Sequence, residues 1–422
     1  MAKFLLSIYK ILSIIFLPIV IIIVIFRVLQ GKEINYRIKE RFGLSTIRRP
    51  SGKIIWVNAS SIGEYLATIS LIKKIRKKKP NTKILLTTNT KTSALLAQKI
   101  TDKNIIHQFT PQDNPLIIKK FFNYWRPSLV LWMESELWPI ILNKISGSGI
   151  KLILLNGRMS DQSFKNWNYF KLFFKEVISN FSLILTMSKI DQKNFKKLGA
   201  KNLNYIGNLK FCNNEQIYDK NFEKKAKKII SNRPVWLAAS THNKEENFVA
   251  NIHIKLKNKL NLKNLLTVIV PRNIKRASKI KKEIKLIVPS TKLFKSQNIT
   301  KKTEIIIDDS IGQLEMWYKN IKTVFLGKSI PPKGGQNPIE PAKNGCVILS
   351  GRMSNFKEIE KEMIIKKCIL PVKNNSDLYF NIEKCFRKNF YTKKIKIRAK
   401  KYVESKSFIL DKTFKKIEKY IV

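Results

Sequence analysis

The sequence predicts an α/β protein with two parallel-sheet domains that follow an apolar N-terminal helix. Three observations support this prediction: a length of 422 residues, an apolar run near the N-terminus, and two series of short apolar segments alternating with longer amphipathic ones. A chain of this length exceeds one ordinary core and suits two domains of about 100–200 residues each. We expect a helix over residues 1–30, domains over 31–215 and 216–394, and a C-terminal helix over 395–422.

The N-terminal run predicts a membrane helix. Between Phe4 and Phe26 only Lys10 is charged. As a helix this stretch would measure about 35 Å, against a hydrocarbon core of about 30 Å. Basic residues from Arg27 onward stand where a signal peptide would have its cleavage site, so we expect an uncleaved signal-anchor with the body on the cytoplasmic side. A helix lying in the membrane surface is the alternative.

Nine apolar segments are predicted to be buried strands. Each is short, and several are followed by a predicted helix, such as 63–76 or 138–145, which is typical of a parallel sheet covered on both faces. The first domain contributes Ile54–Ala59, Lys83–Thr88, Ser128–Met133 and Lys151–Asn156. The second contributes Val235–Ser240, Leu265–Val270, Glu304–Ile307, Thr323–Leu326 and Cys346–Leu349.

Composition excludes several classes of protein. The 44% hydrophobic content argues against a disordered basic tail, and four scattered cysteines and three scattered histidines argue against a disulfide scaffold or a zinc site. The 82 Lys+Arg residues against 29 Asp+Glu give a net charge of +53, which favours nucleic acid, anionic membranes or phosphorylated substrates. Because the lysines are spread over the whole chain, the charge alone does not select among these partners.

Ligands of open α/β sheets bind at the carboxyl ends of the strands, and three exits of the first domain carry ionisable residues. Glu64 follows Ser61 by three residues, which predicts either a helix cap or a general base facing a ligand. Glu134 and Glu136 follow the third strand, ahead of Pro139, where they could cap a helix or serve the site. Lys210, after Gly207, is either a solvated lysine or a site cation.

Two exits of the second domain suggest an anion site. Arg272 follows Pro271 at the end of a strand and could hold a phosphate. The run from Gly334 to Pro341 (GGQNPIEP) combines two glycines that let backbone N–H groups approach a ligand with prolines that begin a helix. Glu340 in this run could accept hydrogen bonds from ribose hydroxyls.

Together these motifs resemble the Kdo (3-deoxy-D-manno-octulosonic acid) transferases of lipopolysaccharide synthesis. The resemblance rests on WVNASSIGE, MESELWP, NGRMS, IGNLKF, AASTH, VPR and GGQNPIEP, in this order behind an apolar N-terminus. It implies a GT-B glycosyltransferase, with two Rossmann-like domains facing each other across a cleft. It also implies CMP-Kdo as the donor, a lipid A precursor (lipid IVA) as the acceptor, and the cell inner membrane as the location.

The resemblance assigns roles to individual residues. Glu64 matches the general base of an inverting single displacement, and Glu134 with Lys210 matches the pair that stabilises the transition state. The CMP-binding segments correspond to Pro271, Arg272, Ile311, Gly312, Gln313, Asn337, Pro338, Ile339 and Glu340. Gln336 and Gln313 depart from the usual His and Glu of the family, which bears on donor affinity. Because a single phosphate can leave without a metal, we expect no metal and no cofactor.

Other interpretations remain open at this stage. A basic, aromatic surface near Arg158, Trp167, Tyr169 and Phe173 could hold the acceptor, or its aromatic rings could simply be core contacts of a helix. A nucleotide-sugar 2-epimerase would share the two-domain layout. A membrane-tethered RNA-binding protein would account for the charge, although we expect no nucleic-acid partner.

Overall fold

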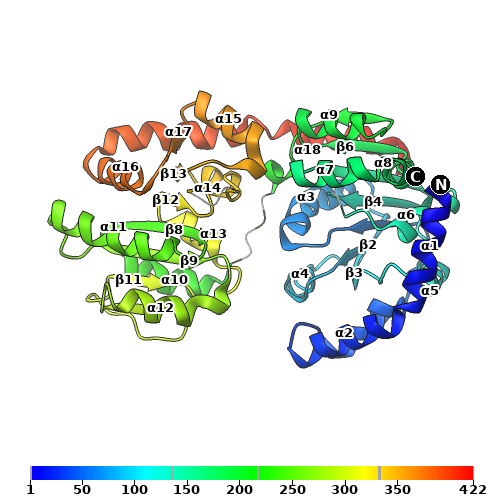
Figure 1. Ribbon diagram of the computed structural model, residues 1–422, viewed down its shortest axis with the longest axis horizontal. Helices are drawn as coiled ribbons and strands as arrows, with labels where there is room; N and C mark the ends of the chain where they lie inside the picture. The colour runs from blue at the N-terminus through cyan, green and yellow to red at the C-terminus, as the bar shows by residue number, and fades with distance from the viewer. Residues whose placement is uncertain (1, 135, 214, 216–217, 331–333, 422) are drawn as a thin grey trace. The chain divides into compact units, whose positions relative to one another are not determined.

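The computed structural model describes residues 2–134, 136–213, 215, 218–330 and 334–421. The chain divides into two compact units (Figure 1). Unit 1 comprises Met1–Glu215 together with Ser407–Val422, and unit 2 comprises Gln216–Lys406. Ser135, inside one of the quoted motifs, and Gln216, the expected first residue of the second domain, lie outside the described residues.

Unit 1 contains a parallel sheet with the strand order β3-β2-β1-β4-β5-β6-β7 over its described residues. Its strands are β1 (Ile54–Asn58), β2 (Lys83–Thr88), β3 (Ile105–Phe109), β4 (Leu129–Met133), β5 (Lys151–Gly157), β6 (Leu183–Thr186) and β7 (Leu203–Tyr205). Its helices after residue 50 are α3 (Ile62–Lys78), α4 (Lys91–Ala97), α5 (Pro115–Trp125), α6 (Pro139–Gly147), α7 (Asp161–Tyr169), α8 (Lys171–Ile178), α9 (Lys189–Lys197) and the 3-10 helix η2 (Leu209–Cys212). Because the chain leaves β1 toward β2 and later returns to pair β4 with β1, the exits of β1 and β4 form the topological switch point.

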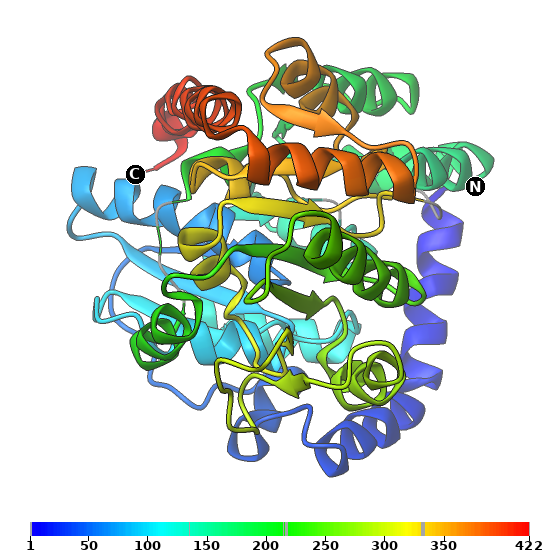
Figure 2. The ribbon, with the colours of Figure 1, turned by 90° about the vertical axis from the view of Figure 1, so that its left-hand side faces the viewer.

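Unit 2 repeats this architecture, with the strand order β10-β11-β9-β8-β12-β13-β14. Figure 2 shows these strands side by side, with helices packed around them. The strands are β8 (Val235–Thr241), β9 (Leu266–Pro271), β10 (Thr291–Leu293), β11 (Ile305–Ile307), β12 (Thr323–Leu326), β13 (Val347–Ser350) and β14 (Ile369–Pro371). The helices are α10 (Lys220–Ile230), α11 (Glu245–Lys259), η3 (Ile274–Arg276), α12 (Ala277–Lys285), α13 (Leu314–Asn320), α14 (Ile339–Lys343), η4 (Ser354–Phe356), α15 (Lys357–Ile365), α16 (Asn375–Arg387) and α17 (Asn389–Glu404).

The nine predicted strands are confirmed, each to within one residue at either end. The prediction missed β3, β6, β7, β10 and β14. Four of these have only three or four residues, too few to show a pattern. The pairs of neighbouring strands in both sheets are parallel, as expected from their continuous apolar runs.

The core of unit 1 is aromatic at its centre. Trp56 on β1 and Trp132 on β4 are fully buried and meet edge to face, with ring centroids 5.6 Å apart. The indole of Trp56 donates to Thr87 Oγ1 at 2.8 Å, so its polar atom is satisfied inside the core. These rings fix the spacing of the two strands whose exits form the switch point.

The expectation of one continuous N-terminal helix was wrong. The apolar run forms α1 (Ala2–Ile15) and α2 (Leu17–Leu29), which meet at Phe16. Pro18 cannot donate a backbone hydrogen bond and its ring crowds the preceding turn, which accounts for the break. In the described part of the chain, each helix taken alone is too short or too polar to span a bilayer. Only α1 and α2 taken together have the necessary length and apolar composition, and the angle between them is 56°.

The C-terminal segment also differs from the single helix expected over 395–422. It consists of the end of α17, then α18 (Phe408–Ile417) and the 3-10 turn η5 (Glu418–Tyr420). Ser405 Oγ donates to the carbonyl of Tyr402 at 2.8 Å, a local bond that competes with helix continuation. After this break, residues 407–422 belong to unit 1.

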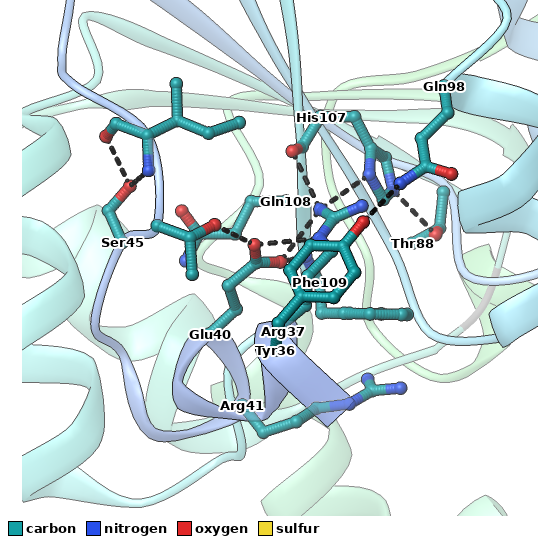
Figure 3. Close-up of polar contacts among 12 residues, drawn as sticks. Tyr36, Arg37, Glu40, Arg41, Ser45, Thr88, Gln98, His107, Gln108 and Phe109 are labelled. Carbon is teal, nitrogen blue, oxygen red and sulfur yellow. Dashed lines mark hydrogen bonds and ion pairs between the residues drawn. The ribbon is translucent and has the colours of Figure 1, made fainter. Parts of the chain in front are cut away.

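A buried ion-pair network attaches the segment after α2 to the sheet of unit 1 (Figure 3). Arg37 on the 3-10 helix η1 (Asn35–Phe42) donates to both carboxylate oxygens of Glu40, at 2.9 and 2.8 Å. The carboxylate of Glu40, which is fully buried, also accepts the backbone N–H of Phe109 on β3 at 2.7 Å. Burial, with the nearby charges of Arg37 and Arg41, lowers the pKa of His107 to about 3, so its neutral ring accepts from Arg37.

Replacing Glu40 by Ala is expected to lower the free energy of unfolding of unit 1 by about 3–5 kcal/mol, because Arg37 would stay buried without its counter-charge. Urea unfolding followed by hydrogen exchange of unit 1 peptides measures this. Asp411→Ala is the matched control, because Asp411 pairs with Lys74 in the same unit but its side chain is 71% exposed. The control is expected to cost at most about 1 kcal/mol. Equal losses in the two variants would contradict the prediction.

Candidate active site

Glu64 lies in the first turn of α3, directly after the exit of β1. Ser61 is the N-cap of this helix, and its hydroxyl accepts the backbone N–H of Glu64 at 3.4 Å. In return, the Glu64 carboxylate accepts the backbone N–H of Ser60 at 2.8 Å and the hydroxyl of Ser61 at 2.9 Å. The predicted helix cap is therefore present, and the carboxylate is held in one orientation.

The Glu64 carboxylate is also buried, with 6% of the residue exposed. Burial and, next, the negative charge of Glu134 raise its pKa to about 7, against the opposing effect of the Ser60 and Ser61 hydrogen bonds. A carboxyl with this pKa exchanges protons near neutral pH. The cap and the base are thus compatible interpretations of the same side chain.

Glu134 and Lys210 form an ion pair beside this carboxylate. Lys210 Nζ lies 2.6 Å from Glu134 Oε1, and both side chains are more than four-fifths buried. Glu134 follows β4 with a φ of 53°, a left-handed backbone that non-glycine residues adopt rarely and mostly where the surroundings enforce it. Asn156 Nδ2 supports the same carboxylate oxygen at 3.4 Å, and Asn156 Oδ1 accepts the N–H of Leu209 next to the lysine.

Gly63 brings this ion pair next to the first turn of α3. A Cβ built on Gly63 would lie 4.0 Å from Nζ of Lys210, an ordinary van der Waals distance. The ammonium group therefore lies against the same turn that carries Glu64. The structure brings the three predicted residues Glu64, Glu134 and Lys210 together at the switch point of the sheet.

Polar side chains around Glu136 form a further hydrogen-bonded group beside these residues; sequence reasoning named Glu136 but missed its partners. One oxygen of Glu136 accepts from the hydroxyl of Ser60, from Asn89 Nδ2 at 3.2 Å and from the indole of Trp138 at 3.3 Å. Asn89 is itself fixed by its backbone, which donates to the carbonyl of Ser60 at 3.0 Å. The paired carboxylates of the MESELWP motif were a signal for Glu136, whereas nothing in the sequence distinguished Asn89.

In unit 2, Arg272 is exposed directly after Pro271, the last residue of β9. Near the exits of β8 and β12, His242 accepts from the amide of Gln336 at 3.3 Å. Burial and the charges of Lys328 and Arg272 lower the pKa of His242, which suits a neutral ring in this role. Gln336, which stands where the family usually has His, is thus held in place by a histidine of another strand exit.

The remaining predicted nucleotide-binding residues lie in two loops of unit 2. Ile311 is 65% exposed, Gly312 has a φ of 76°, and Gln313 is buried with its side chain accepting the N–H of Asp219 at 3.0 Å.

In the other loop, Asn337 Nδ2 donates to Glu340 Oε1 at 3.3 Å and Asn337 Oδ1 accepts the N–H of Ile339 at 3.1 Å. Pro338 is the N-cap residue of α14. Gly335 has a φ of 69°, and a Cβ at this position would lie 2.6 Å from the Cα of Met353. Any other residue would therefore clash with Met353.

The aromatic residues considered for an acceptor surface divide into two groups. Trp167 and Phe173 are partly buried and pack against the core of unit 1, as the core-contact interpretation requires. Tyr169 is 86% exposed. The sequence had not separated these two environments within one helical segment.

Glu134→Gln is expected to lower the pKa of Glu64 from about 7 toward its ordinary value, because it removes the neighbouring negative charge and frees Lys210 to act on Glu64. The ¹³C shift of the Glu64 carboxyl, titrated between pH 4 and 9, measures the change. Asp411→Asn, a charge removal elsewhere in unit 1, is the control and should leave this pKa in place. An unchanged or higher pKa in Glu134→Gln would be inconsistent with the proposed electrostatics.

Known proteins are similar to this chain over most of its length. The family model for 3-deoxy-D-manno-octulosonic-acid transferase matches residues 36–213, which include Glu64, Glu134 and Lys210. A 3-deoxy-D-manno-octulosonic acid transferase of Rickettsia bellii is 31% identical over 419 residues, covering 98% of this chain and 99% of the relative. One of Haemophilus influenzae is 30% identical over 364 residues, covering 82% of each chain.

Solved structures share the fold at low identity. A glycosyltransferase from Rickettsia africae has a TM-score of 0.59 at 15% identity, over 88% of this chain and 99% of its own. The UDP-GlcNAc 2-epimerase of Neisseria meningitidis has a TM-score of 0.61 at 10% identity, over 87% of this chain and all of its own. The two parallel-sheet units are those of a GT-B fold. The near full-length relatives show that the chain belongs to the 3-deoxy-D-manno-octulosonic acid transferase family and is a glycosyltransferase enzyme.

Proposed function

We propose that this enzyme transfers Kdo from CMP-Kdo to a lipid A precursor, lipid IVA, in lipopolysaccharide synthesis. Residues 31–215 would bind the acceptor, and residues 216–394 would bind the donor. The observation that carries the proposal is the buried Glu64 carboxyl, with a pKa of about 7, at the switch point of the first sheet. An enzyme that deprotonates a sugar hydroxyl near neutral pH needs a base of this kind.

The reaction is an inverting single displacement. The acceptor hydroxyl gives its proton to Glu64 while its oxygen forms a bond to the anomeric carbon of Kdo. The bond from that carbon to the phosphate oxygen breaks, and CMP leaves with the electron pair. Because the attack comes from the face opposite to the leaving group, the anomeric configuration inverts.

Lys210 lies against the helical turn that carries this base, and its ammonium group is 2.6 Å from Glu134 Oε1. We assign the pair to stabilising negative charge that develops in the transition state. A preorganised ammonium in a water-poor site does this without reorganisation at the moment of reaction. The ion pair also keeps Lys210 from neutralising Glu64 directly.

In unit 2 the exposed Arg272 side chain is free to contact the donor phosphate, and its backbone is fixed by a hydrogen bond from its N–H to the carbonyl of Thr241 at 2.9 Å. Pro271, the Ile311-Gly312-Gln313 turn and the loop from Asn337 to Glu340 would surround the nucleotide. Gln336, held by His242, supplies an amide where the family usually has an imidazole. We expect this replacement to affect donor affinity, not the class of reaction.

We also propose that α1 and α2 hold the enzyme at the cytoplasmic face of the inner membrane, near its lipid acceptor. Their exposed apolar side chains include Phe4, Ile11, Ile15, Phe16, Ile23, Ile25 and Phe26, which we assign to this contact. Basic residues follow at Arg27 and Lys32. This distribution suits contact with hydrocarbon and anionic head groups.

Glu64→Gln is expected to lower kcat by about 10²–10⁴-fold, because the amide keeps the shape of the cap but accepts no proton. CMP release and the mass of the lipid product measure turnover with CMP-Kdo and lipid IVA. In the wild type, activity should rise as the pH increases through about 7, because the Glu64 carboxyl then loses its proton. This rise in activity should be absent from the pH profile of the variant. Near-normal turnover by a folded Glu64→Gln enzyme would refute the assignment of the base.

The same assay separates the proposal from its two rivals. A 2-epimerase would change the donor sugar and leave the lipid mass unaltered. An RNA-binding protein would release no CMP and would bind RNA with a steep dependence on salt.

Arg272→Ala is expected to raise the KM for CMP-Kdo by about 10–100-fold, because a charged hydrogen bond to the phosphate is lost. Lys275→Ala is the matched control: it removes one exposed positive charge only three residues away. Steady-state kinetics at fixed acceptor concentration give both values. If the two variants shift the KM equally, the effect is one of general charge and Arg272 has no specific role.

A further inference from the structure

A groove runs between the N-terminal helix pair and the body of unit 1. Its volume is about 610 Å³, within the range of about 300–1,000 Å³ that is typical of small-molecule sites. Its apolar wall is formed by Leu12, Phe16, Leu17 and Val20 from the helices and by Leu137 and Trp138 from the body. Figure 1 shows α1 running along α5 and α6, on the side of unit 1 that carries this groove.

Hydrogen bonds connect the walls of the groove and give partners to several of its polar groups. Tyr9 donates to Asp113 Oδ2 at 3.1 Å, and Asp113 also accepts the N–H groups of Ile140 and Ile141 at the start of α6. Asn114 Nδ2 donates to the carbonyl of Ser13 at 2.8 Å. Because these groups already have partners, an occupant gains little from hydrogen bonds here and much from apolar contact.

Trp138 connects the groove to the candidate catalytic residues through a short series of hydrogen bonds. The indole of Trp138, which lines the groove, donates to Glu136 Oε2 at 3.3 Å. That oxygen also accepts from the hydroxyl of Ser60, whose backbone N–H donates to Glu64 at 2.8 Å. A head group attached to a molecule in the groove could therefore lie only a few side chains away from Glu64.

We propose that this groove binds one fatty acyl chain of the glycolipid acceptor and thereby places the sugar hydroxyl at Glu64. The inference rests on the proposed function and adds to it a binding site for the apolar part of the acceptor. An acyl chain matches the apolar wall, and a phosphorylated head group matches the net charge of +53. The chain of a bulk phospholipid would fit the apolar wall equally well. We favour the acceptor because the hydrogen bonds that run from Trp138 to Glu64 connect the groove to the proposed base.

The test fills the groove and compares acceptors that differ in acyl length. Leu17→Trp and Val20→Phe place larger side chains in the groove, and Ile22→Trp is the matched control on the exposed side of α2, where Ile22 is 64% exposed. Each enzyme is assayed with CMP-Kdo and two synthetic acceptors, one with long and one with very short acyl chains. A photoreactive long-chain acceptor, with its diazirine in mid-chain, is crosslinked to the wild type and the labelled peptides are identified.

With the long-chain acceptor, the two filling variants are expected to lose at least tenfold in kcat/KM, since each methylene excluded from an apolar site costs about fourfold in binding. With the short-chain acceptor they should match the wild type, and Ile22→Trp should match it with both acceptors. Crosslinks should fall within residues 9–20, 112–114 and 137–139.

Three kinetic results would overturn the inference. They are equal losses with both acceptors, no loss with either, or an Ile22→Trp enzyme as impaired as the filling variants, which would point to bulk membrane lipid. Crosslinks confined to the outer face of α2 would do the same. Failure of the wild type to transfer Kdo to any acceptor would be seen before the variants are compared, and it would refute the proposed function and this inference together.

Discussion

The site depends on the burial of one carboxyl group, that of Glu64, for which the described part of the chain supplies no ion-pair partner. Glu64 is hydrogen-bonded by two neutral donors, from Ser60 and Ser61, while the nearby ammonium of Lys210 is paired with Glu134. Desolvation therefore exceeds the effect of the hydrogen bonds, and the pKa rises to about 7. If Lys210 were paired with Glu64 instead, the pKa would fall and the carboxylate would be a weak base at neutral pH.

Contacts elsewhere in unit 1 reach the residues around Glu64 from the end of α2. Glu33 pairs with Arg27 at the end of α2 and with Arg41 on η1, and Arg41 donates to the carbonyl of Asn89 at 2.6 Å. Asn89 in turn contacts Ser60 and Glu136 beside the base. A continuous series of ionic and hydrogen-bonded contacts thus links α2 to the residues around Glu64.

Sequence patterns gave the strands and the strand exits because buried parallel strands are continuous apolar runs, which are visible in a single sequence. They failed where polar residues are buried through distant partners. In β3, His107 and Gln108 interrupt the apolar pattern, and only the structure shows that Arg37 donates to the ring of His107 and that the indole of Trp125 donates to Gln108 Oε1. Lys210 could not be distinguished among 82 basic residues by its type. The resemblance of the IGNLKF motif selected it, and the structure adds its ion pair with Glu134, 76 positions earlier in the chain.

The helix cap at Glu64 suits the role of general base that we propose for this residue. A carboxylate offers about four lone-pair positions, and the cap occupies two of them, with Ser60 and Ser61. The cap thereby fixes the side-chain orientation before substrate arrives and leaves acceptor capacity for an incoming hydroxyl. The positive end of α3 favours the ionised form and burial favours the protonated form. Because these effects oppose each other, the balance lies near neutrality, where a base can both take up and release a proton.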